Sequence, residues 1–204
     1  LGVDSLGGAA SAFSLAGVFK RGGALLFIDT WSLDAGDGID DKIVFFSNNG
    51  EAVIYEGSYP GSASDWAMVG RYDVSIPLGR NATMQAGGDL AIACVEGLIP
   101  LSSALKKDPS ALRMDAVSKP IEPDWKSVAQ ARGSANWQVI KWPEKNMAII
   151  SMPAALSGGE PAQDLINFVV NLQTGAWAKY TGWDVRCLAY HDQKVFFGTS
   201  DGKV

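Results

Sequence analysis

Short runs of consecutive apolar residues recur along the whole chain, separated by polar segments rich in Gly, Pro, Asn and Ser. Runs of this length between turn residues are typical of buried β-strands. The pattern predicts strands at 24–28, 43–46, 52–55, 66–72, 90–95, 98–101, 137–142, 147–151, 165–171, 176–180, 185–190 and 194–198.

Glycine-containing pairs occur where two predicted strands follow each other closely. Asn49-Gly50 and Asp201-Gly202 favour type I′ turns, in which both central residues have positive φ. Glu96-Gly97 predicts a further hairpin between its flanking apolar runs. Neighbouring strands are therefore expected to pair antiparallel.

The predicted strands are apolar on both faces. Ile43-Val44-Phe45-Phe46 and Val195-Phe196-Phe197 show no alternation, whereas a sheet with one face in water alternates apolar and polar residues. Because tight turns join the strands and crossover helices are missing, we expect antiparallel sheets that stack face to face. In the turn at 171–177, Gly175 should adopt positive φ and Trp177 should pack between neighbouring sheets.

The segment 102–132 differs from the rest because it is polar and contains three prolines. Short helices are predicted at 103–107 and 123–132, the second ending at Gly133. We interpret the segment as a polar, partly helical insertion between strand modules.

A repeat of 46–47 residues relates several positions. Trp137 and Trp183 lie 46 positions apart, and the pairs Asn146/Gln193 and Gly50/Gly97 each lie 47 apart. Propeller blades commonly have roughly 40–50 residues. The sequence therefore predicts an all-β fold of antiparallel β-propeller-like blades, an incomplete or fragmentary propeller. Residues 1–204 are expected to form one such domain, interrupted by the 102–132 insertion.

The charge balance bears on partners. Lys and Arg number 17 and Asp and Glu number 22, which gives a formal net charge of −5, and no run of basic residues forms a stripe. An acidic surface repels phosphate backbones, so no direct nucleic-acid affinity is expected. No apolar run approaches the roughly 18 residues of a membrane span, so none is expected. The chain stops within a hairpin-like pattern at 201–204, which favours a piece of a longer polypeptide.

Four carboxylates in one loop are the only metal-like pattern. Asp34, Asp37, Asp40 and Asp41 supply hard oxygen donors, and two intervening glycines permit a tight turn. The spacing differs from that of an EF-hand, and no Glu closes the loop. We interpret it as a solvated acidic turn, with Ca²⁺ as the alternative.

No constellation of catalytic residues is apparent. His191 is the single histidine and lies in a polar turn, without a nucleophile or an orienting partner in a recognisable setting. Cys94 and Cys187 lie in apolar runs and are interpreted as two buried thiols. We expect no cofactor and no enzymatic activity.

Several turn-and-strand patterns together resemble a known family. They comprise Asn49-Gly50-Glu51-Ala52-Val53-Ile54-Tyr55, Trp66-Ala67-Met68-Val69-Gly70-Arg71-Tyr72, Thr174-Gly175-Ala176-Trp177 and Phe196-Phe197-Gly198-Thr199-Ser200-Asp201-Gly202. These stretches resemble the propeller-containing tail proteins of bacteriophages and prophages, the nozzle or tubular component of short-tailed phages.

The resemblance implies a structural role. It implies an oligomeric ring, often six-fold, around the DNA exit path, with other tail proteins as partners. It also implies a location in the virion after assembly in the bacterial cytoplasm, and it carries no catalytic residues. Two alternatives remain open: a carbohydrate-binding propeller that uses exposed Trp or Tyr as stacking platforms, and a propeller glycosidase.

Overall fold

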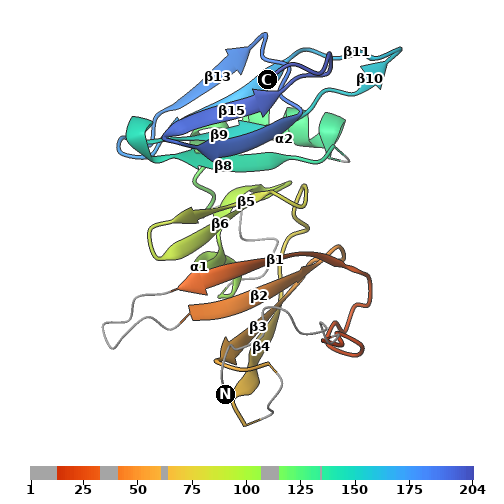
Figure 1. Cartoon of the computed structure of the whole chain (residues 1–204), viewed down its shortest axis with the longest axis vertical. Helices are drawn as coiled ribbons and strands as arrows, with labels where there is room; N and C mark the ends of the chain where they lie inside the picture. The colour runs from red at the N-terminus through yellow and green to blue at the C-terminus, as the bar shows by residue number, and fades with distance from the viewer. Residues whose placement is uncertain (1–12, 33–40, 61–63, 107–114, 134) are drawn as a thin grey trace.

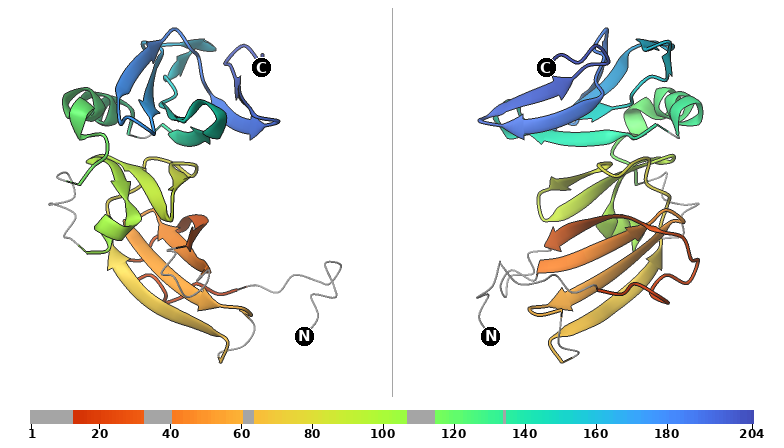
Figure 2. Two further views of the ribbon diagram at one scale, coloured as in Figure 1. Left: turned by 90° about the vertical axis from the view of Figure 1, so that its left-hand side faces the viewer. Right: turned by 45° about the vertical axis from the view of Figure 1, so that its right-hand side comes forward.

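The computed structural model describes residues 13–32, 41–60, 64–106, 115–133 and 135–204. Its strands pair antiparallel within every sheet, so the all-β, antiparallel prediction is confirmed (Figure 1). The sheets follow one another in chain order, from the N-terminal end of the molecule to the C-terminal end (Figures 1 and 2).

The first sheet is a four-stranded meander. Its spatial order is its chain order: β1 (Leu25–Ser32), β2 (Asp41–Ser47), β3 (Glu51–Gly57) and β4 (Trp66–Asp73). Each strand therefore pairs with its neighbour in sequence, which needs only short connections.

The second sheet has three short strands and is followed by the helical part of the chain. The strands are β5 (Thr83–Ala86), β6 (Asp89–Cys94) and β7 (Gly97–Pro100). The helical elements after them are α1 (Leu101–Ala104), η2 (Lys119–Ile121) and α2 (Glu122–Arg132). The predicted helix at 123–132 is confirmed. The one predicted at 103–107 is a single turn that starts earlier, directly at the end of β7.

The third sheet and a two-stranded pair, here called the terminal pair, follow the helical part of the chain. The third sheet is again a meander, with a small hairpin of two-residue strands inserted between its second and third strands. Its elements are β8 (Gln138–Trp142), η3 (Pro143–Lys145), β9 (Met147–Ser151), β10 (Leu156–Ser157), β11 (Glu160–Pro161), β12 (Ile166–Asn171) and β13 (Trp177–Thr181). The terminal pair is β14 (Cys187–His191) with β15 (Lys194–Gly198).

The apolar run of β6 does not alternate because both of its faces are buried, whereas Ile28 of β1 and Phe196 of β15, in similar runs, are 53% and 41% exposed. Leu90 and Ile92 lie in one core cluster with Val44 and Phe46 of the first sheet. Ala91 and Ala93, which point to the opposite face, lie in a second cluster with residues of the third sheet. Both faces of the second sheet are therefore buried, as the continuous apolar pattern predicted.

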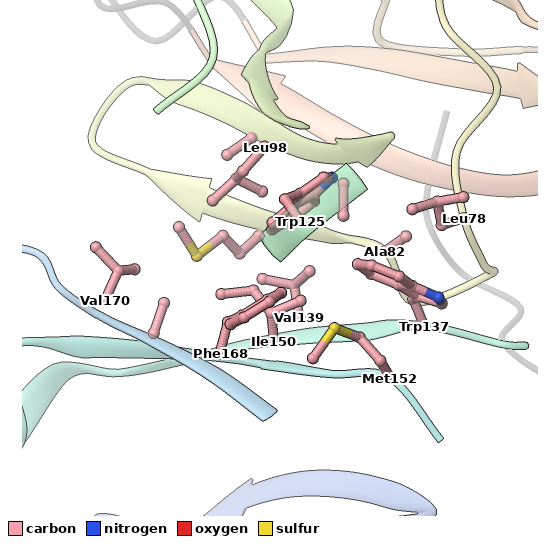
Figure 3. Packing of buried hydrophobic residues seen from close by; sticks show 14 of the residues in the cluster. Leu78, Ala82, Leu98, Trp125, Trp137, Val139, Ile150, Met152, Phe168 and Val170 are labelled. Atoms are coloured by element: carbon pink, nitrogen blue, oxygen red, sulfur yellow. The ribbon is translucent and has the colours of Figure 1, made fainter. Parts of the chain in front are cut away.

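The larger core lies between the second and third sheets and is built around α2 (Figure 3). Trp125 of α2 is 1% exposed, stacks on Phe168 with ring centroids 5.9 Å apart, and donates its indole N–H to the Cys94 carbonyl at 2.9 Å. Trp137 packs beside it at 5.3 Å. The segment interpreted as a polar insertion thus contributes a central core residue.

The turn prediction at Asn49-Gly50 is wrong in type. Gly50 has φ +77°, but Asn49 does not have positive φ. The loop spans three residues, and both the Gly50 and Glu51 N–H groups donate to Ser47, to its carbonyl at 3.4 Å and its hydroxyl at 3.1 Å. A three-residue loop uses a type I turn followed by one left-handed residue, so only the glycine needs positive φ.

The same turn recurs between Thr199 and Lys203. Gly202 has φ +81°, its N–H donates to the Thr199 carbonyl at 3.1 Å, and the Lys203 N–H donates to the Thr199 hydroxyl at 3.0 Å. A type I′-like pair does occur in the two-residue loop between β14 and β15. There Asp192 and Gln193 have φ of +46° and +61°.

The positions of the predicted repeat correspond only in part: Trp137 and Trp183 both precede a first strand, but Trp137 is buried and Trp183 is 37% exposed. Gly50 lies in the loop between the second and third strands of the first sheet, whereas Gly97 is the first residue of the third strand of the second sheet. Asn146 and Gln193 both lie between a first and a second strand. The segment 102–132 falls between the second and third sheets, which interrupts the spacing between these two pairs.

Candidate functional site

The first strands of successive sheets lie next to one another and line a groove of about 430 Å³, here called the first-strand groove. Strands β1, β5, β8 and β14 each contribute to it. Its lining residues are Phe27, Ile28, Asp29, Arg80, Asn81, Thr83, Gln138, Val139, Ile140 and Leu188.

Polar contacts connect each first strand to the next. The Thr83 hydroxyl of β5 donates to the Asp29 carboxylate of β1 at 2.6 Å. The Val139 N–H of β8 donates to the Asn81 carbonyl at 2.8 Å, within an isolated parallel bridge. Gln138 of β8 accepts from the Leu188 N–H of β14 at 2.8 Å. The groove is thus held together by hydrogen bonds across every sheet boundary.

The groove carries little net charge. Asp29 and Arg80 are the charged residues among its lining residues, and they have opposite signs. Gln138 uses both ends of its amide, because its nitrogen also donates to the Arg186 carbonyl at 3.2 Å. Ile28 is 53% exposed and gives part of the groove an apolar wall. The surface is therefore suited to contact without strong electrostatic capture.

A second polar connection joins the first two sheets. The Asp89 carboxylate of β6 accepts from the Trp31 indole N–H of β1 at 3.0 Å and from the Ser102 hydroxyl at 2.6 Å. It also accepts from the Leu90 N–H at 2.8 Å. All of its partners are structural, so this carboxylate joins two sheets and the start of α1.

A third cluster holds the C-terminal turn in place. Asp184 pairs with the Arg186 guanidinium at 2.9 Å and accepts from the Ser200 N–H at 2.8 Å and from its hydroxyl. Partial burial raises the pKa of Asp184, but the hydrogen bonds from Ser200 and the Arg186 charge together bring that pKa below 3.8. This carboxylate is therefore ionised in its structural role.

Other hollows are formed by loops. One of about 700 Å³ lies between the second and third sheets and is lined by Ala86, Gly87, Lys141, Pro143, Asn146, Leu172 and Gln173. Another, about 340 Å³, has Arg132 and Arg186 in its wall. Both guanidinium groups donate to backbone carbonyls, Arg132 to Met152 at 3.0 Å and Arg186 to Ala154.

The residues singled out from the sequence do not converge. Asp34, Asp37 and Asp40 lie outside the described residues, and so does the side chain of Asp41, the first residue of β2. Within the described ranges, no group of three or more His, Cys, Asp or Glu side chains could hold a metal ion. His191 is exposed at the end of β14 and pairs across the hairpin with Lys194.

The two cysteines differ. Cys94 is buried as predicted, and burial, together with the charge of Glu96, raises the pKa of its thiol. The prediction of a buried Cys187 is wrong, because this thiol is exposed. Across the hairpin Cys187 faces Gly198, which has no side chain to cover it.

Sequence reasoning did not find Asp29, Thr83 or Gln138. Asp29 and Gln138 are polar residues inside or beside an apolar run, and that interruption is their only signal, whereas Thr83 lies in a short alternating segment. In the predicted turn at 171–177, the positive φ of Gly175 is confirmed at +70°, and Trp177 packs against the core between the second and third sheets.

In the part of the chain that the structure describes, no helix has the length and apolar character to cross a bilayer.

No protein-family model matches this chain, and no curated protein matches it.

Proposed function

We propose that the chain is a β-propeller-like structural module of a bacteriophage or prophage tail, where it forms part of an oligomeric ring or conduit. The observation that carries this proposal is the stack of antiparallel meanders whose first strands lie side by side along one groove. Propellers place the first strands of consecutive blades around a central channel in this way. The left-handed residues Asn146 and Gln193, each between a first and a second strand, support the same interpretation.

The assignment to a tail draws on the resemblance of the turn-and-strand patterns and on the charge of the molecule. A conduit for DNA must let the phosphate backbone pass without binding it. A net charge of −5 and a first-strand groove with one acidic and one basic residue meet that requirement.

A structural role also agrees with how the polar side chains are used. Asp29, Asp89 and Asp184 each bind groups that connect one sheet or segment to another. A general acid or base instead has to reach the proton of a substrate. We therefore propose that these carboxylates act in assembly of the fold and not in catalysis.

Immunogold labelling tests the assignment to a tail. Antibodies against the purified chain are applied to phage or prophage particles purified from the source strain. We expect gold particles at the tail and none on the capsid. Protein that is present in the lysate but absent from purified particles would refute the proposal.

The two alternatives are tested separately on the purified chain. Glycan-array binding with saturable affinity would favour a carbohydrate-binding module, and release of sugar in a hydrolysis screen would favour a glycosidase. We expect neither, because the groove amide of Gln138 and the hydroxyl of Thr83 are already hydrogen bonded.

A further inference from the structure

Residues 13–24, here called the covering segment, lie against the first sheet. Phe13 stacks on Phe45 with ring centroids 5.9 Å apart and meets Tyr55 edge to face at 5.7 Å. Phe45 is only 6% exposed, although it points away from the core that its neighbour Phe46 shares with the second sheet. The covering segment therefore helps to bury the outer face of the first sheet.

Two neighbouring asparagines in the turn between β2 and β3 hold the covering segment in opposite ways. The side-chain oxygen of Asn48 accepts from the Ala24 N–H at 2.8 Å. The side-chain Nδ2 of Asn49 instead donates to the Arg21 carbonyl at 3.0 Å. An oxygen is therefore sufficient at Asn48, whereas the bond made by Asn49 requires the N–H of an intact amide.

Asn49 is also the residue whose amide is most open to chemical attack by the backbone. It is the one asparagine in the sequence that precedes a glycine, and it is exposed. Gly50 has no side chain beside the bond that joins the two residues. The Gly50 N–H makes only a long hydrogen bond, 3.4 Å to the Ser47 carbonyl. The backbone nitrogen next to the Asn49 amide is therefore weakly held.

We propose that Asn49 is a site of spontaneous deamidation and that the reaction loosens the covering segment. The Gly50 nitrogen bonds to Cγ of Asn49 while the Cγ–Nδ2 bond breaks, and Nδ2 leaves as ammonia with the proton of the Gly50 N–H. Water then opens the resulting succinimide ring and leaves aspartate or isoaspartate at position 49. The product lacks the N–H donor and places a carboxylate against the Arg21 carbonyl.

Incubation of the purified, unaltered chain in mildly alkaline buffer tests the reaction, because the attacking nitrogen must lose its proton. Peptide mapping by mass spectrometry should show aspartate and isoaspartate at position 49, whereas Asn48 beside it should remain asparagine. A synthetic peptide of residues 45–55 is incubated alongside as the reference. A folded chain that keeps Asn49 intact after the peptide has been converted would overturn the proposal.

Trypsin measures how firmly the covering segment is held. It cleaves after Lys20 and Arg21, whose backbone N–H groups donate to the Glu51 carboxylate at 2.9 and 2.7 Å. Cleavage requires local opening, so its rate follows the fraction of molecules in which the segment is open. Loss of one hydrogen bond should raise this rate at least about fivefold in the deamidated chain. The comparison is made before and after incubation of the native chain, so it does not depend on how any variant folds.

Two matched variants separate the loss of the donor from the gain of a negative charge. Asn49→Asp removes the N–H that binds Arg21 and should be cleaved at least about fivefold faster than the native chain. Asn48→Asp adds the same charge at the adjacent position but keeps an oxygen for the Ala24 N–H, so its cleavage rate should stay within about twofold of the native rate. Equal cleavage of the two variants would show that the Asn49 amide does not hold the segment, and would overturn the proposal.

Discussion

At Gly50 the backbone conformation and the available space impose separate requirements. The residue has φ +77°, and a Cβ there would lie 2.6 Å from the Val74 carbonyl oxygen. At Gly175 the φ is +70°, but a Cβ would meet nothing within 4 Å. Both glycines therefore have a similar positive φ, but only at Gly50 would a side chain collide with a neighbouring atom.

Gly50→Val is expected to lower the free energy of unfolding by about 1–3 kcal/mol, because strain and collision add together. Gly175→Val introduces only the strain of a positive φ, so its free energy of unfolding should fall by a smaller amount. Urea denaturation of both variants measures the difference. Equal losses would show that the contact with Val74 has no energetic weight.

Gln193 presents the opposite situation, since a residue with a side chain holds a left-handed conformation at φ +61°. Gln193→Gly should raise the stability of the β14–β15 hairpin by about 1 kcal/mol. Its backbone carbonyl, which accepts from the Trp142 indole N–H at 3.0 Å, is retained. Hydrogen exchange of the hairpin amides gives the measurement.

Lys194→Gly is the control for that change, because Lys194 lies within β15 and has no positive φ. Lys194→Gly should lower the stability of the β14–β15 hairpin by roughly 0.5–1 kcal/mol, because glycine is more flexible in the unfolded chain. If both glycine substitutions slowed or quickened exchange alike, the turn conformation would not be the cause.

Helix α2 acts as an element of the core. Trp125→Ala should lower the free energy of unfolding by about 3–5 kcal/mol, because it leaves a cavity between the second and third sheets and removes the hydrogen bond to the Cys94 carbonyl. Lys126→Ala, one residue further along the same helix, removes a surface pair with Glu122 and should change it by less than about 0.5 kcal/mol. Similar midpoints for both variants would place Trp125 outside the core.

The segment before β14 should be sensitive to acid. The pKa of Asp184 is lowered in the folded chain, so its stabilisation is complete above pH 3.8 and is lost as the pH falls through the lower folded value. Fluorescence of Trp183 in urea, compared at pH 7 and pH 3, should show an earlier transition in acid. In Asp184→Asn, the urea transitions at pH 7 and pH 3 should lie closer together. An unchanged separation would rule out Asp184 as a source of the acid sensitivity.

At the scale of elements, the sequence predicted those whose apolar run ends sharply at turn residues. Strands β9 and β15 have the predicted bounds, 147–151 and 194–198. Strand β5 was missed because Thr83-Met84-Gln85-Ala86 alternates and is short. The start of α1 was merged into the preceding strand because Leu101 continues the apolar run of β7.

The first-strand groove lay beyond sequence reasoning for a different reason. Asp29, Thr83 and Gln138 are brought together by the stacking of sheets, which depends on contacts between residues more than 50 positions apart. Nothing in the local pattern around a polar residue in a strand says which other strand it will meet. The acidic loop predicted at Asp34–Asp41 shows the reverse. Its four carboxylates are recognisable in the local sequence, but the sequence does not say which other residues lie near them.

The whole molecule is expected not to bind DNA. With a net charge of −5 and a nearly neutral groove, the isolated chain should show no change in the fluorescence anisotropy of labelled duplex or single-stranded DNA at physiological salt. Micromolar affinity that weakens steeply with added salt would reveal a phosphate-contacting surface. It would also replace the passive conduit with a DNA-binding module.

The chain-ordered meanders also set the order in which the molecule is completed as it leaves the ribosome. The first sheet has all four strands once residue 73 has emerged, and its pairings are between sequence neighbours. The second sheet is different, because its outer face is closed only by Trp125, Phe168 and other residues made much later. Translation therefore passes through an interval in which this face is exposed. A pause placed there by slow codons would lengthen the time available for misassembly or for capture by a chaperone.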